Sequence, residues 1–256
     1  TQSELLEKKL TEASKNKIRV DHIYDELSLP PFGIRPGIAP VFMVSSLLLK
    51  RGELALYEHG TFRPRVSVTV VERLLKNPQN FEIKYFASRT GNRSKYMEKL
   101  AKSLEMPKTT DLNVVSVVSG LIEGISSVPP HILRTKQLSE NAMHLRKALL
   151  EATEQDDLIF QSIPKVLGFD KINATGDYPE GELKKLTKVI SESFNQLTNA
   201  YTHLLGDLRN DLAKALETNA TNELRQELHV RANALNGKII NKELQKLVSA
   251  LTSGHD

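Results

Sequence analysis

The hydrophobic positions of this chain follow helical spacing over most of its length. Between residues 182 and 217 they recur every three or four residues, which predicts a single helix of about ten turns. A helix this long must be covered by others, and residues 222–235 and 241–251 are the expected partners. Shorter segments predict further helices at 109–129, 139–152 and 155–169. Residues 107–256 are therefore predicted to form an all-helical bundle.

Two stretches nearer the start alternate apolar and polar positions instead, as half-buried strands do. The stretch "FEIKYFA" (81–87) is a clean example, and the turn "EHGT" (58–61) follows Leu54 and Leu56, which predicts a short β-hairpin. A helix over 70–77, capped by Thr69, is expected between the hairpin and the strand.

A few helices packed on a small antiparallel sheet resemble a winged-helix module. The predicted fold class is therefore mainly α. We expect an N-terminal helix (1–17), a winged-helix-like α+β module (18–106) and an all-helical bundle with one long helix (107–256).

The stretch "LPPFGIRPGIAP" (29–40) raises the question of a phosphate-binding glycine loop. Pro36 and Pro40 remove two of the backbone amides that such a loop would use, and no Lys-Ser or Lys-Thr follows. We interpret it as a rigid corner, with Leu29, Phe32 and Ile34 packed beneath a core helix over 38–50. The aliphatic run from residue 41 to residue 49 is expected to be the most buried segment of the chain.

Composition narrows the possible classes of protein. The chain has 256 residues, 39% of them hydrophobic, which is enough for a sizeable core. It has no cysteine, which excludes disulfides and thiolate metal sites and fits a cytoplasmic location. The longest apolar run, "IAPVFMVSSLLL", has twelve residues, short of the roughly 20 that a membrane span needs. No membrane partner is expected.

No motif in the sequence indicates a particular catalysed reaction. The stretch "GDYPEGEL" (176–183) has the glycine spacing of a P-loop, but Glu182 stands where the phosphate-binding lysine belongs. The seven histidines are not paired at metal-binding spacing. We therefore assign no catalytic residue, metal or cofactor. An enzyme would require a pocket with converging polar groups, which the sequence does not reveal.

Positive charge is concentrated in one region. Residues 61–100 hold nine Lys and Arg against three Glu, a local charge of +6, although the whole chain carries only +4. If the hairpin is a wing, these side chains could lie along a phosphate backbone. An ordinary solvated face would carry the same charges, and that is the simpler interpretation. The candidate nucleic-acid contacts are Arg63, Arg65, Arg73, Lys76, Lys84, Arg89, Arg93 and Lys95.

Three segments in succession, "LPPFGIRPGIAPVFMVSSLLL", "ELALYEHGTFRP" and "VVERLLKNPQNFEI", resemble an internal region of large bacterial ATP-binding proteins of phage-defence systems of the BREX type. The similarity extends through "ILRTKQLSENAMHLRKALLEATEQDDLIF". It implies a non-catalytic region of a larger antiviral machine. The nucleotide-binding motifs of those ATPases are absent from this sequence, so no active-site residue is carried over.

The sequence therefore leaves two alternative functions. The first is a DNA-engaging or docking region of a cytoplasmic antiviral ATPase, with duplex DNA and other subunits as partners. The alternative is a protein-interaction scaffold that mediates assembly without touching nucleic acid. Since the chain begins without methionine on a charged helix, we expect it to be part of a longer protein.

Overall fold

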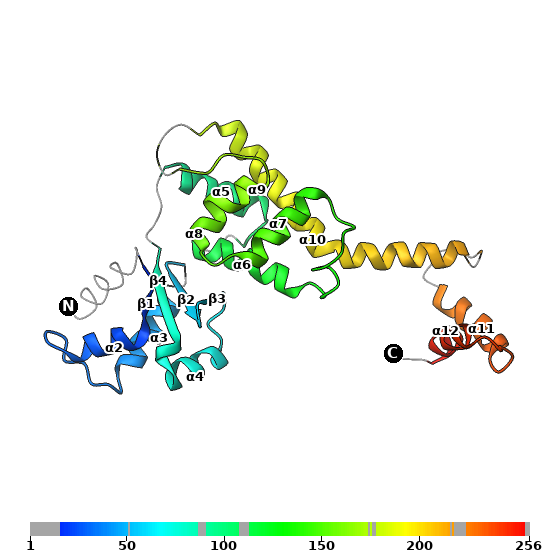
Figure 1. Ribbon diagram of the computed structural model, residues 1–256, viewed down its shortest axis with the longest axis horizontal. Helices are drawn as coiled ribbons and strands as arrows, with labels where there is room; N and C mark the ends of the chain where they lie inside the picture. Colours follow the sequence, from blue (N-terminus) through cyan, green and yellow to red (C-terminus); the bar gives the residue numbers. More distant parts are fainter. Residues whose placement is uncertain are drawn as a thin grey trace. The chain divides into compact units, whose positions relative to one another are not determined.

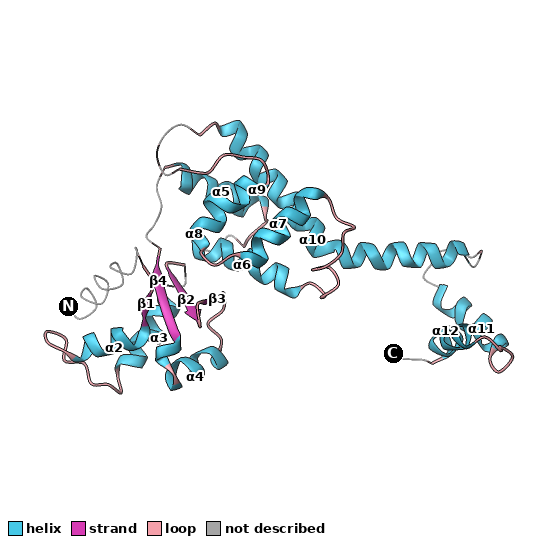
Figure 2. Cartoon of the chain, viewed as in Figure 1, coloured by secondary structure: helices cyan, strands magenta, loops and turns pink. Residues whose placement is uncertain are grey.

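The computed structural model describes residues 16–50, 52–86, 91–107, 113–173, 175, 178–215, 217 and 224–253. This part of the chain is mainly helical with a small antiparallel sheet, as predicted (Figures 1 and 2). The N-terminal helix expected within 1–17 and the candidate Arg89 lie outside the described residues, apart from residues 16 and 17. Contacts divide the chain into two compact units, residues 1–198 and 199–256. The division falls inside the long helix, whereas the sequence pattern placed a boundary at residue 107.

A four-stranded antiparallel sheet lies in the first unit, with the strand order β1-β4-β2-β3. Its strands are β1 (Ile18–Arg19), β2 (Leu54–Glu58), β3 (Thr61–Arg63) and β4 (Phe81–Tyr85). The hairpin and β4 were predicted, but the two-residue β1 is too short to leave an alternating pattern. His59 and Gly60 join β2 to β3 with φ angles of 50° and 74°. Positive φ at both positions is typical of the mirror-image turns that match the twist of a hairpin.

The two faces of the sheet are covered by different helices. One face packs on α2 (Val20–Ser28), α3 (Ala39–Leu49) and α4 (Val68–Lys76), around Leu56 of β2 and the opposite residue Ile83 of β4. On the other face, the Tyr57 hydroxyl donates a hydrogen bond to the buried side chain of Gln155. Because successive strand residues point to opposite faces, both coverings together bury every residue of β2.

Helices complete the first unit. They are α5 (Asn92–Ser103), α6 (Val114–Ser127), α7 (Glu140–Glu151), α8 (Gln155–Asp157), α9 (Ile163–Val166) and the first part of α10 (Glu180–Ala215), with a 3₁₀ turn at Pro78–Asn80. The sequence predicted a helix broken at Pro164. The structure instead places a π-helical turn, Leu158–Ser162, just before it. Proline lacks a donor N–H and fits the first turn of α9, so the chain continues.

Two glycines mark places where segments approach closely. A Cβ atom added to Gly52, in the turn after α3, would overlap the side chain of Asn113. That side chain accepts a hydrogen bond from the Ser116 amide at 2.9 Å and so caps α6, which begins later than the predicted residue 109. A Cβ atom on Gly124 of α6 would overlap the Phe194 ring of α10.

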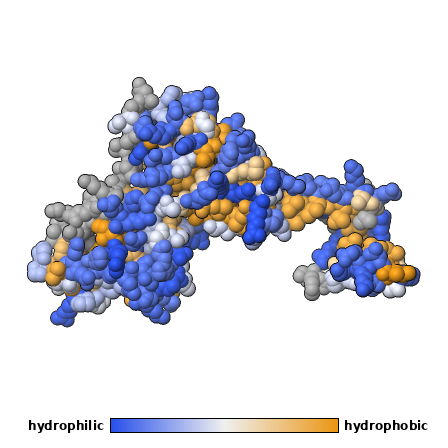
Figure 3. Space-filling model, viewed as in Figure 1, coloured by the Kyte–Doolittle hydropathy of each residue, from blue (hydrophilic) through white to orange (hydrophobic). Residues whose placement is uncertain are grey.

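The second unit contains the end of α10, α11 (Leu224–Leu235) and α12 (Lys242–Thr252). Its small core joins Ala213 to Leu224 and Leu228, with Leu251 packed against them. The sequence predicted that these two helices cover α10, but four large side chains of α10 stay exposed: Tyr201, Leu205, Leu208 and Leu212. Hydrophobic residues are accordingly visible along the second half of α10 (Figure 3).

Among the described helices, none contains a stretch long and apolar enough to cross a lipid bilayer.

Candidate functional site

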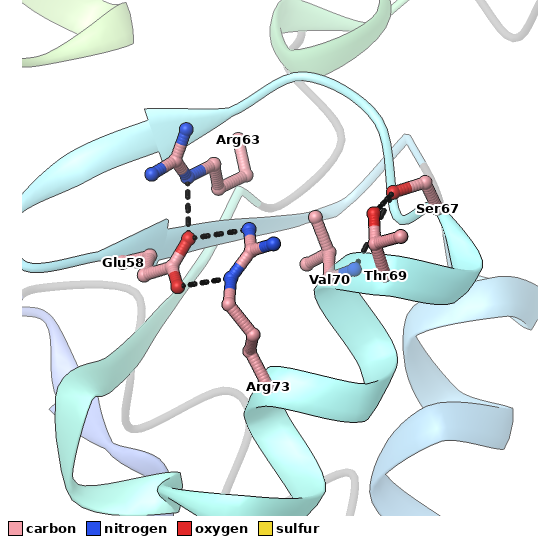
Figure 4. A network of polar contacts seen from close by, with 6 residues as sticks. All are labelled: Glu58, Arg63, Ser67, Thr69, Val70 and Arg73. Atoms are coloured by element: carbon pink, nitrogen blue, oxygen red, sulfur yellow. Dashed lines mark hydrogen bonds and ion pairs between the residues drawn. The ribbon is translucent and has the colours of Figure 1, made fainter.

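A buried carboxylate organises the basic side chains of the hairpin. Glu58, at the end of β2, accepts two hydrogen bonds from Arg73 of α4, with Nε–Oε1 at 2.7 Å and Nη2–Oε2 at 2.9 Å. Arg63 of β3 approaches the same carboxylate from the other side, with its Nε 2.8 Å from Oε2 (Figure 4). Two guanidinium groups therefore share one negative charge, which leaves a local charge of +1 on two half-exposed side chains.

The electrostatics of this cluster follow from its geometry. The hydrogen bonds from Arg73 lower the pKa of Glu58 below its usual value, and the charge of Arg63 acts in the same direction against the effect of burial. Glu58 therefore stays ionised at neutral pH, and the two arginines are held in place by a fixed anion.

The start of α4 positions Arg73 on this face. Ser67 is the N-cap residue, and its hydroxyl accepts a hydrogen bond from the Val70 amide at 3.4 Å. The sequence predicted Thr69 as the cap, which is wrong by two positions because the helix begins at Val68. The Thr69 hydroxyl lies 2.9 Å from the Ser67 hydroxyl instead.

Two more of the candidate contacts lie near this cluster in sequence. Arg65 forms a bidentate ion pair with Glu123 of α6, with both N–O distances at 2.7 Å, although 79% of its side chain is exposed. Lys76 is exposed in the last turn of α4. Arg63 is thus part-exposed, whereas Arg65, Arg73 and Lys76 are exposed, and we call these four residues the hairpin basic set.

The other candidate residues do not join this set. Lys84 points to the opposite face of the sheet, where its Nζ lies 2.6 Å from Glu154 and its side chain is largely buried. Arg93 donates a hydrogen bond to the Ile172 carbonyl oxygen and stacks over the Phe160 ring. Lys95 is exposed on α5. The sequence grouped all eight candidates as one basic cluster, but the partners of Lys84 and Arg93 hold those two side chains within the fold.

The larger surprise is α3, which was expected to be a core helix. Only one side of it enters the core, through Ala39, Met43 and Leu47. On the opposite side, large apolar residues are exposed at five positions: Ile38 (46%), Val41 (62%), Phe42 (36%), Leu48 (42%) and Leu49 (85%). With Ser45 they are spaced by three and four residues, so they occupy one stripe of the helix. We call this stripe the α3 face.

The corner before α3 also departs from the prediction in part. Ile34 is buried and Phe32 packs against the core, as expected, but 59% of Leu29 is exposed. The signal that could have revealed the α3 face was the composition of the helix, because a helix that is apolar on every side needs cover on every side. The small sheet and its other helices cover α3 on one side only.

The α3 face borders a cavity of about 430 Å³. Leu47 and Leu48 of α3, Leu54 and Leu56 of β2 and Val115 of α6 form its apolar walls, with Arg63 and Arg65 also lining it. The cavity therefore has the apolar walls and few charged groups that are typical of a site for an apolar side chain or a small ligand.

A second cavity, of about 620 Å³, lies beside α7 and is lined mostly by polar residues that include His144, Glu151 and Asp157. Among its acids, Glu154 is already bound by Lys17 and Lys84, each at 2.6 Å, and Asp157 accepts a hydrogen bond from Gln161. Within the described ranges, no three His, Asp or Glu side chains are placed to hold a metal ion.

Comparisons with known protein families, curated proteins and solved structures find no match to this chain.

Proposed function

We propose that this chain is a protein-interaction module, and that the α3 face binds another protein chain. The observation that carries the proposal is the exposure of five large apolar side chains on one stripe, four of them in the 11-residue helix α3 and the fifth, Ile38, at its N-cap. Such a stripe offers a patch on the order of 500 Å², within the range of the largest apolar patch of a typical monomer, and such patches often mark interaction sites. Scattered exposed leucines would need no explanation, but this stripe is contiguous.

The neighbourhood of the stripe favours a protein partner over a nucleic acid. The α3 face carries no charged side chain between Ile38 and Leu49, so it offers nothing to a phosphate backbone. The α3 face therefore suits an internal region of a larger assembly. We accordingly retain as part of the proposal the context that the resemblance implies, a phage-defence ATPase.

Sedimentation velocity of a fluorescently labelled chain tests this proposal. The labelled protein is measured both purified and in cell extract, and Val41→Glu on the α3 face is compared with Val230→Glu on α11. Both valines are more than half exposed, so neither change removes core packing. We expect Val41→Glu to abolish any species heavier than the monomer and Val230→Glu to leave it in place. Identical sedimentation of all three proteins under both conditions would overturn the proposal.

A specific observation favours a second candidate function, DNA engagement by the hairpin basic set. Arg63 and Arg73 share the single carboxylate of Glu58, and both keep guanidinium N–H groups beyond those that this carboxylate uses. Half-exposed, pre-positioned guanidiniums are suited to phosphate oxygens. This candidate is narrower than the sequence-based one, because it no longer includes Lys84 or Arg93.

Fluorescence anisotropy of a labelled DNA duplex separates the two candidates. DNA engagement predicts an affinity that falls steeply with salt and a shallower salt dependence for Lys76→Gln, since each lost phosphate contact reduces the slope by about one. Lys188→Gln, an exposed lysine of α10, is the matched control. Undetectable or salt-independent binding would eliminate this candidate and leave the protein-interaction proposal unaffected.

A further inference from the structure

We infer that the partner of the α3 face is a second copy of this chain, bound so that the two α3 helices pack antiparallel about a two-fold axis at Ser45. This inference rests on the proposed function and specifies its partner. It is argued from the symmetry of the stripe, its lack of charge and its area.

The stripe is symmetric about Ser45. Val41 and Phe42 lie four and three residues before it, and Leu48 and Leu49 lie three and four residues after it. In an antiparallel helix pair centred on Ser45, each residue before the centre faces the residue at the same offset after the centre in the other copy. Phe42 then faces Leu48, and Val41 faces Leu49. Every large apolar residue next to the centre thus meets an apolar residue, as a two-fold interface requires.

The centre of the stripe is small and uncharged. A residue on a two-fold axis meets its own copy, so a charged residue there would repel itself. The centre is instead Ser45, and no charged residue occurs between Ile38 and Leu49. A small central side chain also allows helix axes to approach to roughly 8–10 Å, the usual distance for packed helices.

The size of the α3 face predicts a weak dimer. A stable interface buries about 800 Å² on each partner, and the apolar stripe provides on the order of 500 Å². The stripe can therefore form the apolar centre of the interface, with polar neighbours as its rim. Phe42 of one copy would lie over Leu48 of the other, beside the cavity that Leu48 lines. This placement gives each copy an aromatic contact at the edge of the partner's cavity.

Disulfide trapping tests the geometry, because the chain contains no cysteine of its own. With a Cα radius of about 2.3 Å on each helix, axes roughly 8–10 Å apart bring facing Cα atoms to about 3.4–5.4 Å, which overlaps the range of about 4.4–6.8 Å that a disulfide spans. We expect Ser45→Cys to form a covalent dimer under mild oxidation at least about tenfold faster than Ser94→Cys, an exposed serine of α5. Adding Val41→Glu to Ser45→Cys should remove this advantage.

Sedimentation equilibrium of the unmodified chain provides the second measurement. We expect a monomer–dimer equilibrium at about 100 µM, which Val41→Glu shifts to monomer and Val230→Glu does not. The inference is overturned if the purified chain is monomeric at this concentration and Ser45→Cys is trapped no faster than Ser94→Cys. A heavier species that forms only in extract and is abolished by Val41→Glu would then uphold the protein-interaction proposal while rejecting the second copy. If no heavier species forms either in extract or with the purified chain, and Ser45→Cys is trapped no faster than Ser94→Cys, both the protein-interaction proposal and the second copy are rejected.

Discussion

Arg73 on α4 and Glu58 on β2 form a bidentate ion pair, with distances of 2.7 and 2.9 Å, that fastens a helix to the sheet across fifteen residues of sequence. The carboxylate is buried and the guanidinium is half exposed. The pair therefore combines a structural role with a charge that remains accessible to solvent.

Replacing Glu58 with Gln should destabilise the chain in a manner that depends on pH. The pKa of Glu58 is lowered in the folded state, so its stabilising effect is complete above the unfolded value of about 4.3 and is lost as the pH falls through the folded value. We expect a loss of roughly 1 kcal/mol at pH 7, since both arginines are part-exposed. Urea unfolding at a series of pH values measures this loss.

The matched control for this substitution is Glu72→Gln, at an exposed position of α4, the helix that carries Arg73. Its unfolding midpoint should change little at any pH. A difference in stability between wild type and Glu58→Gln that persisted undiminished in acid, where the Glu58 carboxyl of the wild type is protonated, would show that the effect is not electrostatic.

The hydrogen bond between Tyr57 and Gln155 should be worth more than an average one, because both residues are almost fully buried. Tyr57→Phe leaves the Gln155 amide oxygen without its donor, and we expect a cost of about 1–3 kcal/mol. Adding Gln155→Leu should recover part of that loss, since both polar groups are then absent. A double-mutant cycle by urea unfolding measures the coupling, and strictly additive losses would contradict it.

Two glycines of α6 should respond to alanine in opposite directions. The Cβ atom of Gly124→Ala would overlap the Phe194 ring, so we expect a loss of about 1–3 kcal/mol. At Gly120 the nearest atom is the flexible end of Met106, 3.2 Å away, and alanine should gain up to about 1 kcal/mol from helix propensity. Thermal unfolding of the two variants measures both changes, and a gain of stability for Gly124→Ala would contradict the packing of α6 on α10.

Three tyrosines with buried hydroxyl groups, of which Tyr24 is only partly buried as a residue, should lose their protons at unusually high pH. Burial raises the pKa of Tyr24 to about 12 and the pKa values of Tyr57 and Tyr96 further, because the phenolate would lose its hydration. We expect the absorbance change at 295 nm to have two phases, with the later one arising from these side chains. The Tyr24→Phe variant should reduce the amplitude of the later phase only. A single phase near the ordinary tyrosine pKa of about 10 would contradict their burial.

The fold was predictable to the extent that it depends on local periodicity. The run of residues 182–217 predicted α10 to within two residues at each end, and the alternation around Ile83 predicted β4. What could not be predicted depends on partners distant in sequence. Lys84 has the pattern of an exposed strand residue, but Glu154, seventy residues away, binds it inside the fold.

The α3 segment illustrates the same limit. Its apolar residues correctly predict a helix, yet periodicity cannot reveal how many sides of a uniformly apolar helix will be covered. That depends on how much structure surrounds it. The exposed α3 face, on which the proposed function rests, was therefore absent from the sequence-based picture.

The Asn113 side chain fills the space that a side chain at Gly52 would need, and this limits which residues evolution can place at the two positions. Any side chain at residue 52 displaces the Asn113 side chain that caps α6, so neither position can change freely while the other is retained. Among related chains, these two positions should vary as a compensating pair: a larger residue at 52 should accompany a smaller one at 113, with the α6 cap supplied by another side chain.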